Sequence, residues 1–226
     1  FQGLRYLLVD GSFQSCAFRE TMESCFGYVH VLPEYAEENA SALLIGLGAG
    51  SLAREMEFED AVEIDPMVFR AAHDYFGYPG TAIFEDGRAY LRQTQKKYDT
   101  IVMDAFSGYN PAAHLYTKEF FALAKSRMNP GGRLIINTVG TDKGEIQSDI
   151  YSTLKTEYAN VAVLKLKNRF PNYIFIASES PIEGNFTTLP PGEIITDDYN
   201  TVEFKAARIS IEWRDLNHGW IGEHII

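Results

Sequence analysis

Residues 42–51 read Ala-Leu-Leu-Ile-Gly-Leu-Gly-Ala-Gly-Ser, and this stretch decides the fold. The apolar residues at 43–45 form a continuous hydrophobic run, which is typical of a strand buried on both faces of a parallel sheet. Glycines then alternate with other residues, so that the backbone turns tightly and its amides approach a ligand without a Cβ in the way. These glycines are Gly46, Gly48 and Gly50. A strand followed by such a turn predicts a crevice that binds a nucleoside.

A second apolar segment leads into acidic residues, in the run Ala-Val-Glu-Ile-Asp at 61–65. Glu63 comes seventeen residues after Gly46, at the place where the ribose of a bound nucleoside is expected. A carboxylate there accepts hydrogen bonds from both ribose hydroxyls, and each bond contributes about 1.5–3 kcal/mol. The alternative is an ordinary glycine-rich turn between a strand and a helix, with no ligand.

Strand and helix signals alternate along the rest of the chain. They predict an α/β protein with a doubly wound, mostly parallel sheet, an N-terminal β-hairpin and an antiparallel C-terminal edge. The predicted strands are 4–10, 13–18, 42–47, 60–64, 81–84, 98–103, 133–137, 160–166 and 172–178. The predicted helices begin near Ser51, Pro66, Gly87, Thr117 and Gly144, and the Thr117 helix ends at Asn129-Pro130-Gly131-Gly132.

The chain divides into three segments. Residues 1–3 (Phe-Gln-Gly) resemble the remnant of a tag-protease site, which leaves the sequence upstream of residue 4 open. Residues 4–35 form the N-terminal hairpin segment, and residues 36–226 form a nucleoside-cofactor-binding domain of catalytic type. A chain of 226 residues with 46% hydrophobic content is long enough to bury such a core.

Composition restricts the partners and the compartment. A formal net charge of −11 argues against a nucleic-acid surface and suits small cationic ligands. Cys16 and Cys25 match neither a metal-binding spacing nor a disulfide framework, which favours reduced thiols and a cytoplasmic location. No hydrophobic run approaches the roughly 18 residues of a membrane-spanning helix. The alternative that this is the soluble domain of a longer, membrane-anchored protein stays open. The histidines are scattered and predict no metal site.

Carboxylates follow the predicted parallel strands at one edge of the sheet, where ligands of such folds bind. Asp65 and Asp86 each precede a helix, so their alternative role is N-capping, worth about 1 kcal/mol. Like charges on one rim repel unless hydroxyls, amines or a cation lie between them, so the group as a whole predicts a polar cofactor site. The four residues are Glu63, Asp65, Asp86 and Asp104.

Four runs carry a family resemblance: Leu-Ile-Gly-Leu-Gly-Ala-Gly at 44–50, Val-Glu-Ile-Asp-Pro at 62–66, Glu-Asp-Gly-Arg-Ala-Tyr-Leu at 85–91 and Tyr-Asp-Thr-Ile-Val-Met-Asp-Ala-Phe-Ser at 98–107. Together they resemble the spermidine synthase (polyamine aminopropyltransferase) family, within the class I methyltransferase fold. Asp10-Gly11 with Gln14 is similar to the family's Asp-Gly-x-x-Gln hairpin. The resemblance covers about residues 6–140 and, more loosely, residues 195–199.

The resemblance implies a co-substrate, S-adenosylmethionine or its decarboxylated form, and no metal. It places Gln14 on the sulfonium side, Glu63 at the ribose and Asp86 at the adenine amino group. Asp104 then lies beside the propylamine or methionine portion. The full predicted cofactor-binding set is Gln14, Gly46, Gly48, Gly50, Glu63, Ile64, Asp65, Asp86, Gly87 and Asp104.

The acceptor half departs from the family. Where the family carries Asp-Ser-Ser-Asp, this chain has Asp104-Ala105-Phe106-Ser107, so a serine replaces the expected amine-binding carboxylate. Arg19 stands where an aspartate is usual, and its positive charge repels a polyamine. The predicted catalytic residues are Asp104, Ser107 and Tyr116, with Tyr109 and Asp197-Asp198 as further substitute acceptors.

Three functions remain open. The first is transfer of an aminopropyl group to a small, cationic amine. The second is methyl transfer from S-adenosylmethionine, with Arg19 offsetting the carboxylate of the cofactor. The third is a non-catalytic module that binds a nucleoside or a partner. The resemblance also implies a homodimer, and Trp213 and Trp220 are expected to pack either on the sheet or on the other subunit. Neither a nucleic-acid nor a membrane partner is expected for this fragment.

Overall fold

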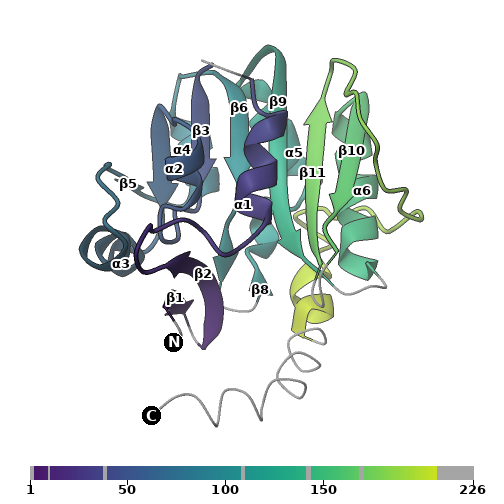
Figure 1. Ribbon diagram of the computed structural model, residues 1–226. Coiled ribbons are helices and arrows are strands. Elements are labelled where there is room, and N and C mark those ends of the chain that lie inside the picture. The colour runs from purple at the N-terminus through teal and green to yellow at the C-terminus, as the bar shows by residue number, and fades with distance from the viewer. Residues whose placement is uncertain are drawn as a thin grey trace.

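A seven-stranded sheet forms the centre of the protein (Figure 1). Its strands are β3 (Ala42–Ile45), β4 (Asp60–Glu63), β5 (Ile83–Phe84), β6 (Tyr98–Met103), β9 (Met128–Val139), β10 (Asn160–Lys165) and β11 (Asn172–Ser178). They are seen in a computed structural model, which describes residues 3–9, 11–37, 40–107, 110–140, 144–167 and 171–207.

The strand order is β10-β11-β9-β6-β3-β4-β5. The five strands from β9 to β5 run parallel to one another, whereas β11 pairs antiparallel with both β9 and β10. This arrangement confirms the predicted doubly wound sheet with an antiparallel C-terminal edge.

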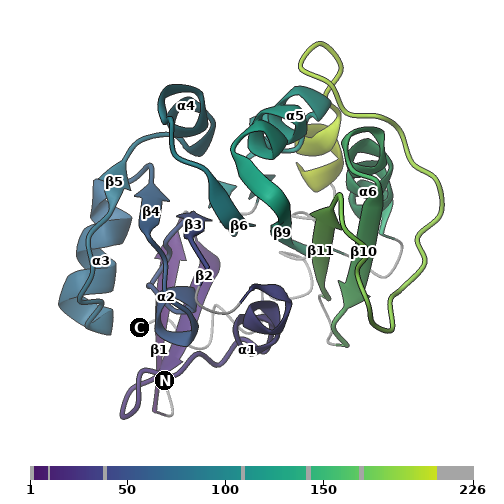
Figure 2. The same cartoon turned by 90° about the horizontal axis from the view of Figure 1, so that it is seen from above.

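Helices cover both faces of the sheet (Figure 2). One face carries α1 (Tyr28–Val31), α2 (Leu52–Glu55) and α3 (Pro66–Phe76), and the other carries α4 (Gly87–Gln93), α5 (Lys118–Ser126) and α6 (Glu145–Glu157). Successive strand side chains point to opposite faces, so Leu43 packs in the core under α4, α5 and α6, and its neighbour Leu44 packs in the core under α1, α2 and α3. Both faces are therefore apolar, which explains the continuous hydrophobic run in β3.

The hairpin of β1 (Leu4–Val9) and β2 (Ser12–Phe18) forms a separate two-stranded sheet. Figure 1 shows it at the end of the main sheet where the parallel strands have their carboxyl ends. Leu7 and Ala17 pack with Ala49 of the glycine turn and Phe76 of α3. The hairpin is thereby fixed against the residues that were predicted to bind a cofactor.

Cys16 and Cys25 form a disulfide, with Cα atoms 5.3 Å apart, so the prediction of reduced thiols is wrong. The chain folds back after β2 and pairs Ala17 with Ser24, while the Cys25 amide donates to the Cys16 carbonyl over 3.0 Å. The spacing of nine residues gave no sign of this reversal. The disulfide ties β2 to the segment that leads into α1.

Several boundaries also differ from the prediction. Helix α5 ends at Ser126, and β9 already begins at Met128, because the Asn129–Gly132 segment continues the strand that pairs with β6. Residues 28–35, for which no element was predicted, form α1 and the 3₁₀ helix η1 (Leu32–Tyr35). Residues 202–207 are also helical, and Trp213 and Trp220 lie outside the described residues. Within the described ranges, no helix combines the length and the apolar character of a membrane span.

Candidate active site

A cavity of about 560 Å³ opens at the carboxyl ends of β3, β4 and β6. Residues of β1 and β2 form one wall, and residues 111–115, with the 3₁₀ helix η2 (Ala113–Leu115), form another. All of the predicted cofactor-binding residues except Gly50 line this cavity. They are Gln14, Gly46, Gly48, Glu63, Ile64, Asp65, Asp86, Gly87 and Asp104.

The glycine turn depends on close backbone contacts. Gly46 has φ +91°, and a Cβ at this position would lie 2.4 Å from the carbonyl oxygen of Asp104. Only glycine lets the turn after β3 approach the end of β6 this closely. Gly50 has a packing role instead, because its Cβ would lie 2.7 Å from the ring of Tyr78.

The amides of the glycine turn donate hydrogen bonds within the protein. The Leu47 amide donates to Glu63 Oε2 and the Ala49 amide to Ser15 Oγ, each over 3.0 Å. The Gly46 and Gly50 amides donate to backbone carbonyls. These four amides are therefore not available to bind the carboxylate of a ligand.

Glu63 is held rigidly at the cavity wall. Its side chain is buried, and its second oxygen, Oε1, accepts from the Asp65 amide over 3.0 Å. A carboxylate oxygen has two acceptor sites, so each oxygen that is fixed by an amide keeps capacity for a ligand hydroxyl. The geometry suits a vicinal diol at this position.

Asp65 and Asp86 both line the cavity and cap helices, so neither of their predicted roles excludes the other. Asp65 accepts from the Met67 amide at the start of α3, and Asp86 accepts from the Arg88 and Ala89 amides at the start of α4. His114 Nε2 also lies 2.7 Å from Asp86 Oδ2. Burial alone would raise the pKa of Asp86, but the His114 and amide hydrogen bonds outweigh it and lower that pKa.

Asp104 lies at the end of β6, between two donors. Tyr28 Oη donates to Asp104 Oδ2 over 2.9 Å, and Asn137 Nδ2 donates to Oδ1 over 2.8 Å. Burial raises the pKa of Asp104 to about 6, although both hydrogen bonds act to lower it. A carboxyl group with this pKa is ionised at neutral pH and is well placed to accept and release a proton.

Tyr116 is fully buried near Asp104. Its hydroxyl has no hydrogen-bond partner among the residues that the structure describes. Burial, followed by the negative charge of Asp104, raises the pKa of Tyr116, so its phenol stays protonated. It is not among the cavity-lining residues.

Of the other residues predicted for the acceptor half, those whose side chains the structure describes do not line the cavity. Arg19 is exposed on the hairpin and does not line the cavity. Asp197 forms an ion pair with Arg88, with 2.5 Å between Arg88 Nη2 and Asp197 Oδ2, and Asp198 is exposed. Ser107 belongs to β7 (Phe106–Ser107), which pairs with β8 (Asn110–Pro111), but its side chain, like all of Tyr109, lies outside the described part.

Sequence reasoning missed several residues of the site, among them Asn137, Tyr28 and His114. Asn137 stands at the end of the predicted fifth strand, so the rule that identified Asp104 also applies to it. Tyr28 and His114 come from the α1 and η2 segments, and no periodicity predicted where these segments lie.

The charged residues that line the cavity are almost all acidic. No lysine or arginine is found among the described lining residues, and His114 is the one basic side chain there. No group of His, Cys, Asp and Glu in the described ranges is arranged to hold a metal ion. The acidic lining residues are Glu63, Asp65, Glu85, Asp86, Asp104 and Glu203.

Comparison with known proteins places the chain in a family. The spermine/spermidine synthase domain matches residues 27–172. A polyamine aminopropyltransferase of Vibrio vulnificus is 33% identical over 135 residues, which cover 54% of this chain and 45% of the relative. An N-terminal histidine N-methyltransferase of Emericella nidulans is 31% identical over 153 residues, covering 63% of this chain and 25% of the relative. The chain thus spans less than half the length of either of these curated relatives.

The fold comparison agrees. The crystal structure of spermidine synthase from Thermotoga maritima superposes with a TM-score of 0.60 at 24% identity, over 76% of this chain and 64% of that one. At this identity the likeness concerns the fold. Because the family domain matches well over half of the residues, the chain belongs to the spermine/spermidine synthase family.

Proposed function

We propose that the protein transfers an aminopropyl group from decarboxylated S-adenosylmethionine to a small amine. The observation that carries this proposal is the charge of the cavity: the described lining residues include six carboxylates and His114, but no lysine or arginine. The decarboxylated cofactor carries a sulfonium and an ammonium but no carboxylate, so every charge on it is attracted to this lining. Intact S-adenosylmethionine carries an additional carboxylate, and the described lining residues include no lysine or arginine to pair with it.

Most amides of the glycine turn are engaged within the protein. The amides of Gly46, Leu47, Ala49 and Gly50 donate to protein acceptors and are not available to a cofactor carboxylate. In the proposed complex, Glu63 accepts from the ribose hydroxyls. Asp86 accepts from the adenine amino group.

Asp104 accepts the proton in the proposed reaction. The acceptor amine enters as an ammonium and gives a proton to the Asp104 carboxylate. Its lone pair then attacks the methylene carbon of the aminopropyl group that is bonded to the sulfonium sulfur. The carbon–sulfur bond breaks, and its electron pair returns to sulfur, which leaves neutral methylthioadenosine and a secondary ammonium. Tyr28 and Asn137 keep the carboxylate oriented through both steps.

Calorimetric titration of the protein with methylthioadenosine, S-adenosylmethionine and its decarboxylated form tests this proposal. We expect the decarboxylated form to bind at least about tenfold more tightly than the intact one, because tenfold corresponds to about 1.4 kcal/mol, a modest value for one misplaced carboxylate. Formation of methylthioadenosine with an aliphatic diamine then measures the transfer. Binding of none of the three compounds would contradict the proposal and favour the non-catalytic alternative.

Methyl transfer is the second candidate, and it is favoured by the similarity to the N-terminal histidine N-methyltransferase. Under this alternative, S-adenosylmethionine binds more tightly than its decarboxylated form, and S-adenosylhomocysteine is the product. The same titration therefore separates the two functions.

A further inference from the structure

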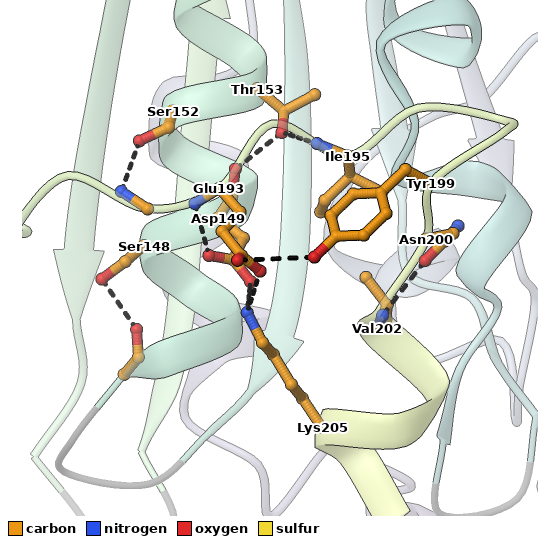
Figure 3. Close-up of polar contacts among 12 residues, drawn as sticks. Ser148, Asp149, Ser152, Thr153, Glu193, Ile195, Tyr199, Asn200, Val202 and Lys205 are labelled. Carbon is orange, nitrogen blue, oxygen red and sulfur yellow. Dashed lines mark hydrogen bonds and ion pairs between the residues drawn. The ribbon is translucent and has the colours of Figure 1, made fainter.

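The segment of residues 192–200 follows β11 and lies beyond the part of the chain that the family domain matches. Figure 3 shows this segment fastened along α6. The Glu193 amide donates to Asp149 Oδ1 over 2.8 Å, and the Ile195 amide donates to Thr153 Oγ1 over 2.9 Å. Asp149 and Thr153 are buried and stand four residues apart, on one face of α6. The segment therefore follows a fixed path along this helix.

The same segment then contacts the start of α5. The Lys118 amide donates to the Ile195 carbonyl over 2.8 Å, and the Asp197 amide donates to Glu119 Oε2 over 2.9 Å. These contacts fix the backbone of Asp197 independently of its side chain. The position of the Asp197 carboxylate is thus set by α5 and α6.

Asp197 binds Arg88 of α4 through both carboxylate oxygens. Arg88 Nη1 lies 2.7 Å from Oδ1, and Nη2 lies 2.5 Å from Oδ2. The Arg88 side chain is 10% exposed and that of Asp197 is 42% exposed, so the guanidinium is the enclosed partner. Hydrogen bonds from Arg88 lower the pKa of Asp197, and the pair is charged at neutral pH. A bidentate pair of this kind fixes direction as well as distance.

Two adjacent carbonyls of η2 are held from either side of this ion pair. Arg88 Nη1 also donates to the His114 carbonyl over 3.2 Å, and Asn200 Nδ2 donates to the Ala113 carbonyl over 2.9 Å. Both acceptor residues line the cavity. We call Arg88, Asp197 and Asn200 the η2 clamp, because they join α4 and the segment of residues 192–200 to this wall.

The clamp acts next to Asp86, which stands two residues before Arg88 at the start of α4. Asp86 Oδ1 accepts from the Arg88 and Ala89 amides, whereas Oδ2 lies 2.7 Å from His114 Nε2. One oxygen is therefore fixed by α4, and the other faces the η2 wall. The space between Asp86 Oδ2 and that wall depends on where the clamp holds η2.

We propose that the η2 clamp positions this wall for the nucleobase, and that it thereby sets the preference for adenine over a base without the exocyclic amino group. The inference rests on the proposed function, because it places the adenine amino group at Asp86. The three clamp residues are not among the described lining residues, so they act through Asp86 and η2 as positioning residues. A segment outside the family domain thus completes the nucleoside end of the site.

Two variants release the clamp in different ways. Arg88→Lys keeps the positive charge but loses the fork that reaches both Asp197 and the His114 carbonyl. Asn200→Asp keeps the oxygen that accepts from the Val202 amide and removes only the donor to η2. Asn200 is exposed, so this second variant should fold even if the first does not.

Calorimetric titration with methylthioadenosine and with 5′-methylthioinosine, which carries a carbonyl in place of the amino group, measures the preference. We expect each variant to bind methylthioadenosine about five- to tenfold more weakly than the parent protein, since a displaced wall weakens a hydrogen bond to a carboxylate. The affinity for methylthioinosine should change by less than about twofold, because this ligand has no amino group to donate to Asp86. Both ligands are uncharged, so the added charge of Asn200→Asp favours neither.

Arg70→Lys is the matched control. Arg70 pairs with Asp74 on the exposed side of α3, and neither residue lines the cavity. This variant should bind both nucleosides as the parent protein does. A reduced preference for adenine in Arg70→Lys as well would overturn the specific role of the clamp.

The remaining outcomes separate this inference from the proposed function. An unchanged preference in the folded variants overturns the role of the clamp and leaves the proposed function standing. Equal weakening of both nucleosides also overturns it, because the effect would not depend on the amino group. Equal affinity of the parent protein for both nucleosides removes Asp86 as the acceptor of the amino group and overturns the inference alone. Failure of the parent protein to bind methylthioadenosine overturns both.

Discussion

Replacing Asp104 by asparagine should stabilise the protein above pH 6 while abolishing transfer. The pKa of Asp104 is raised from 3.8 to about 6 by burial, so the folded state holds the carboxyl proton more tightly than the unfolded state does. The stability that this group contributes is complete below pH 3.8 and is lost as the pH rises through 6. By linkage, the ionisation equilibrium of Asp104 lowers the free energy of unfolding, relative to its value at low pH, by about 1 kcal/mol at pH 4.5 and about 3 kcal/mol at pH 8.

Asparagine is the neutral analogue of the protonated carboxyl group. Its amide oxygen accepts from Asn137, and its amide nitrogen donates to the Tyr28 hydroxyl, so both contacts are kept. Urea unfolding at pH 4.5 and pH 8 should therefore give a stabilisation of the variant that grows by about 2 kcal/mol between the two conditions.

Asp99→Asn is the matched control. Hydrogen bonds from Asn129 and Ser41 lower the pKa of Asp99, so this carboxylate contributes stability that is present at high pH and lost as the pH falls through its folded-state pKa. The control variant should be less stable than the parent protein at pH 8. If Asp104→Asn were also less stable at pH 8, our account of a buried carboxylate held at an energetic cost would be refuted.

Three other contacts, at Tyr28, at the disulfide and at Gly46, each give a further prediction. Tyr28→Phe removes a donor to Asp104 and should move the acidic limb of the kcat/KM profile upward by about 1 pH unit, and an unchanged limb would argue against Asp104 as the proton acceptor. Cys16→Ala with Cys25→Ala opens a loop of nine residues and should lower the free energy of unfolding by about 2.5 kcal/mol, an effect that reductant should reproduce in the parent protein during urea unfolding. Gly46→Ala places a Cβ against the Asp104 carbonyl and should abolish methylthioadenosine binding by calorimetry, whereas retained affinity would show that the turn tolerates displacement.

The sheet could be predicted because its strands carry strong local signals. The apolar run at 43–45 serves both cores, and Asp65 with Pro66 marks the start of α3 through an N-cap and a proline at the first helical position. Helix η1 and the disulfide were missed for a different reason. Both depend on how the chain after β2 folds back on itself, which is a tertiary arrangement that hydrophobic periodicity does not record.

The grouping of the predicted cofactor-binding residues around one cavity was predictable for a topological reason. The carboxyl ends of parallel strands meet at one edge, so residues such as Glu63 and Asp104 could be grouped from their strand positions alone. The acceptor half comes from segments whose placement depends on long-range contacts. Asp197 was predicted at the site but is paired with Arg88, and Glu203 was not predicted but reaches the cavity.

The charge of the cavity links stability to function. Glu63, Asp65, Asp86 and Asp104 line one cavity, and Asp104 is ionised at neutral pH in spite of its burial. In the proposed reaction, a dicationic cofactor and a cationic amine bring positive charge to this acidic lining, so electrostatic attraction contributes to their affinity. Proton transfer to Asp104 then removes one of the attracting charges as the sulfonium becomes a neutral thioether. The product nucleoside is therefore held less strongly than the substrate, which favours its release.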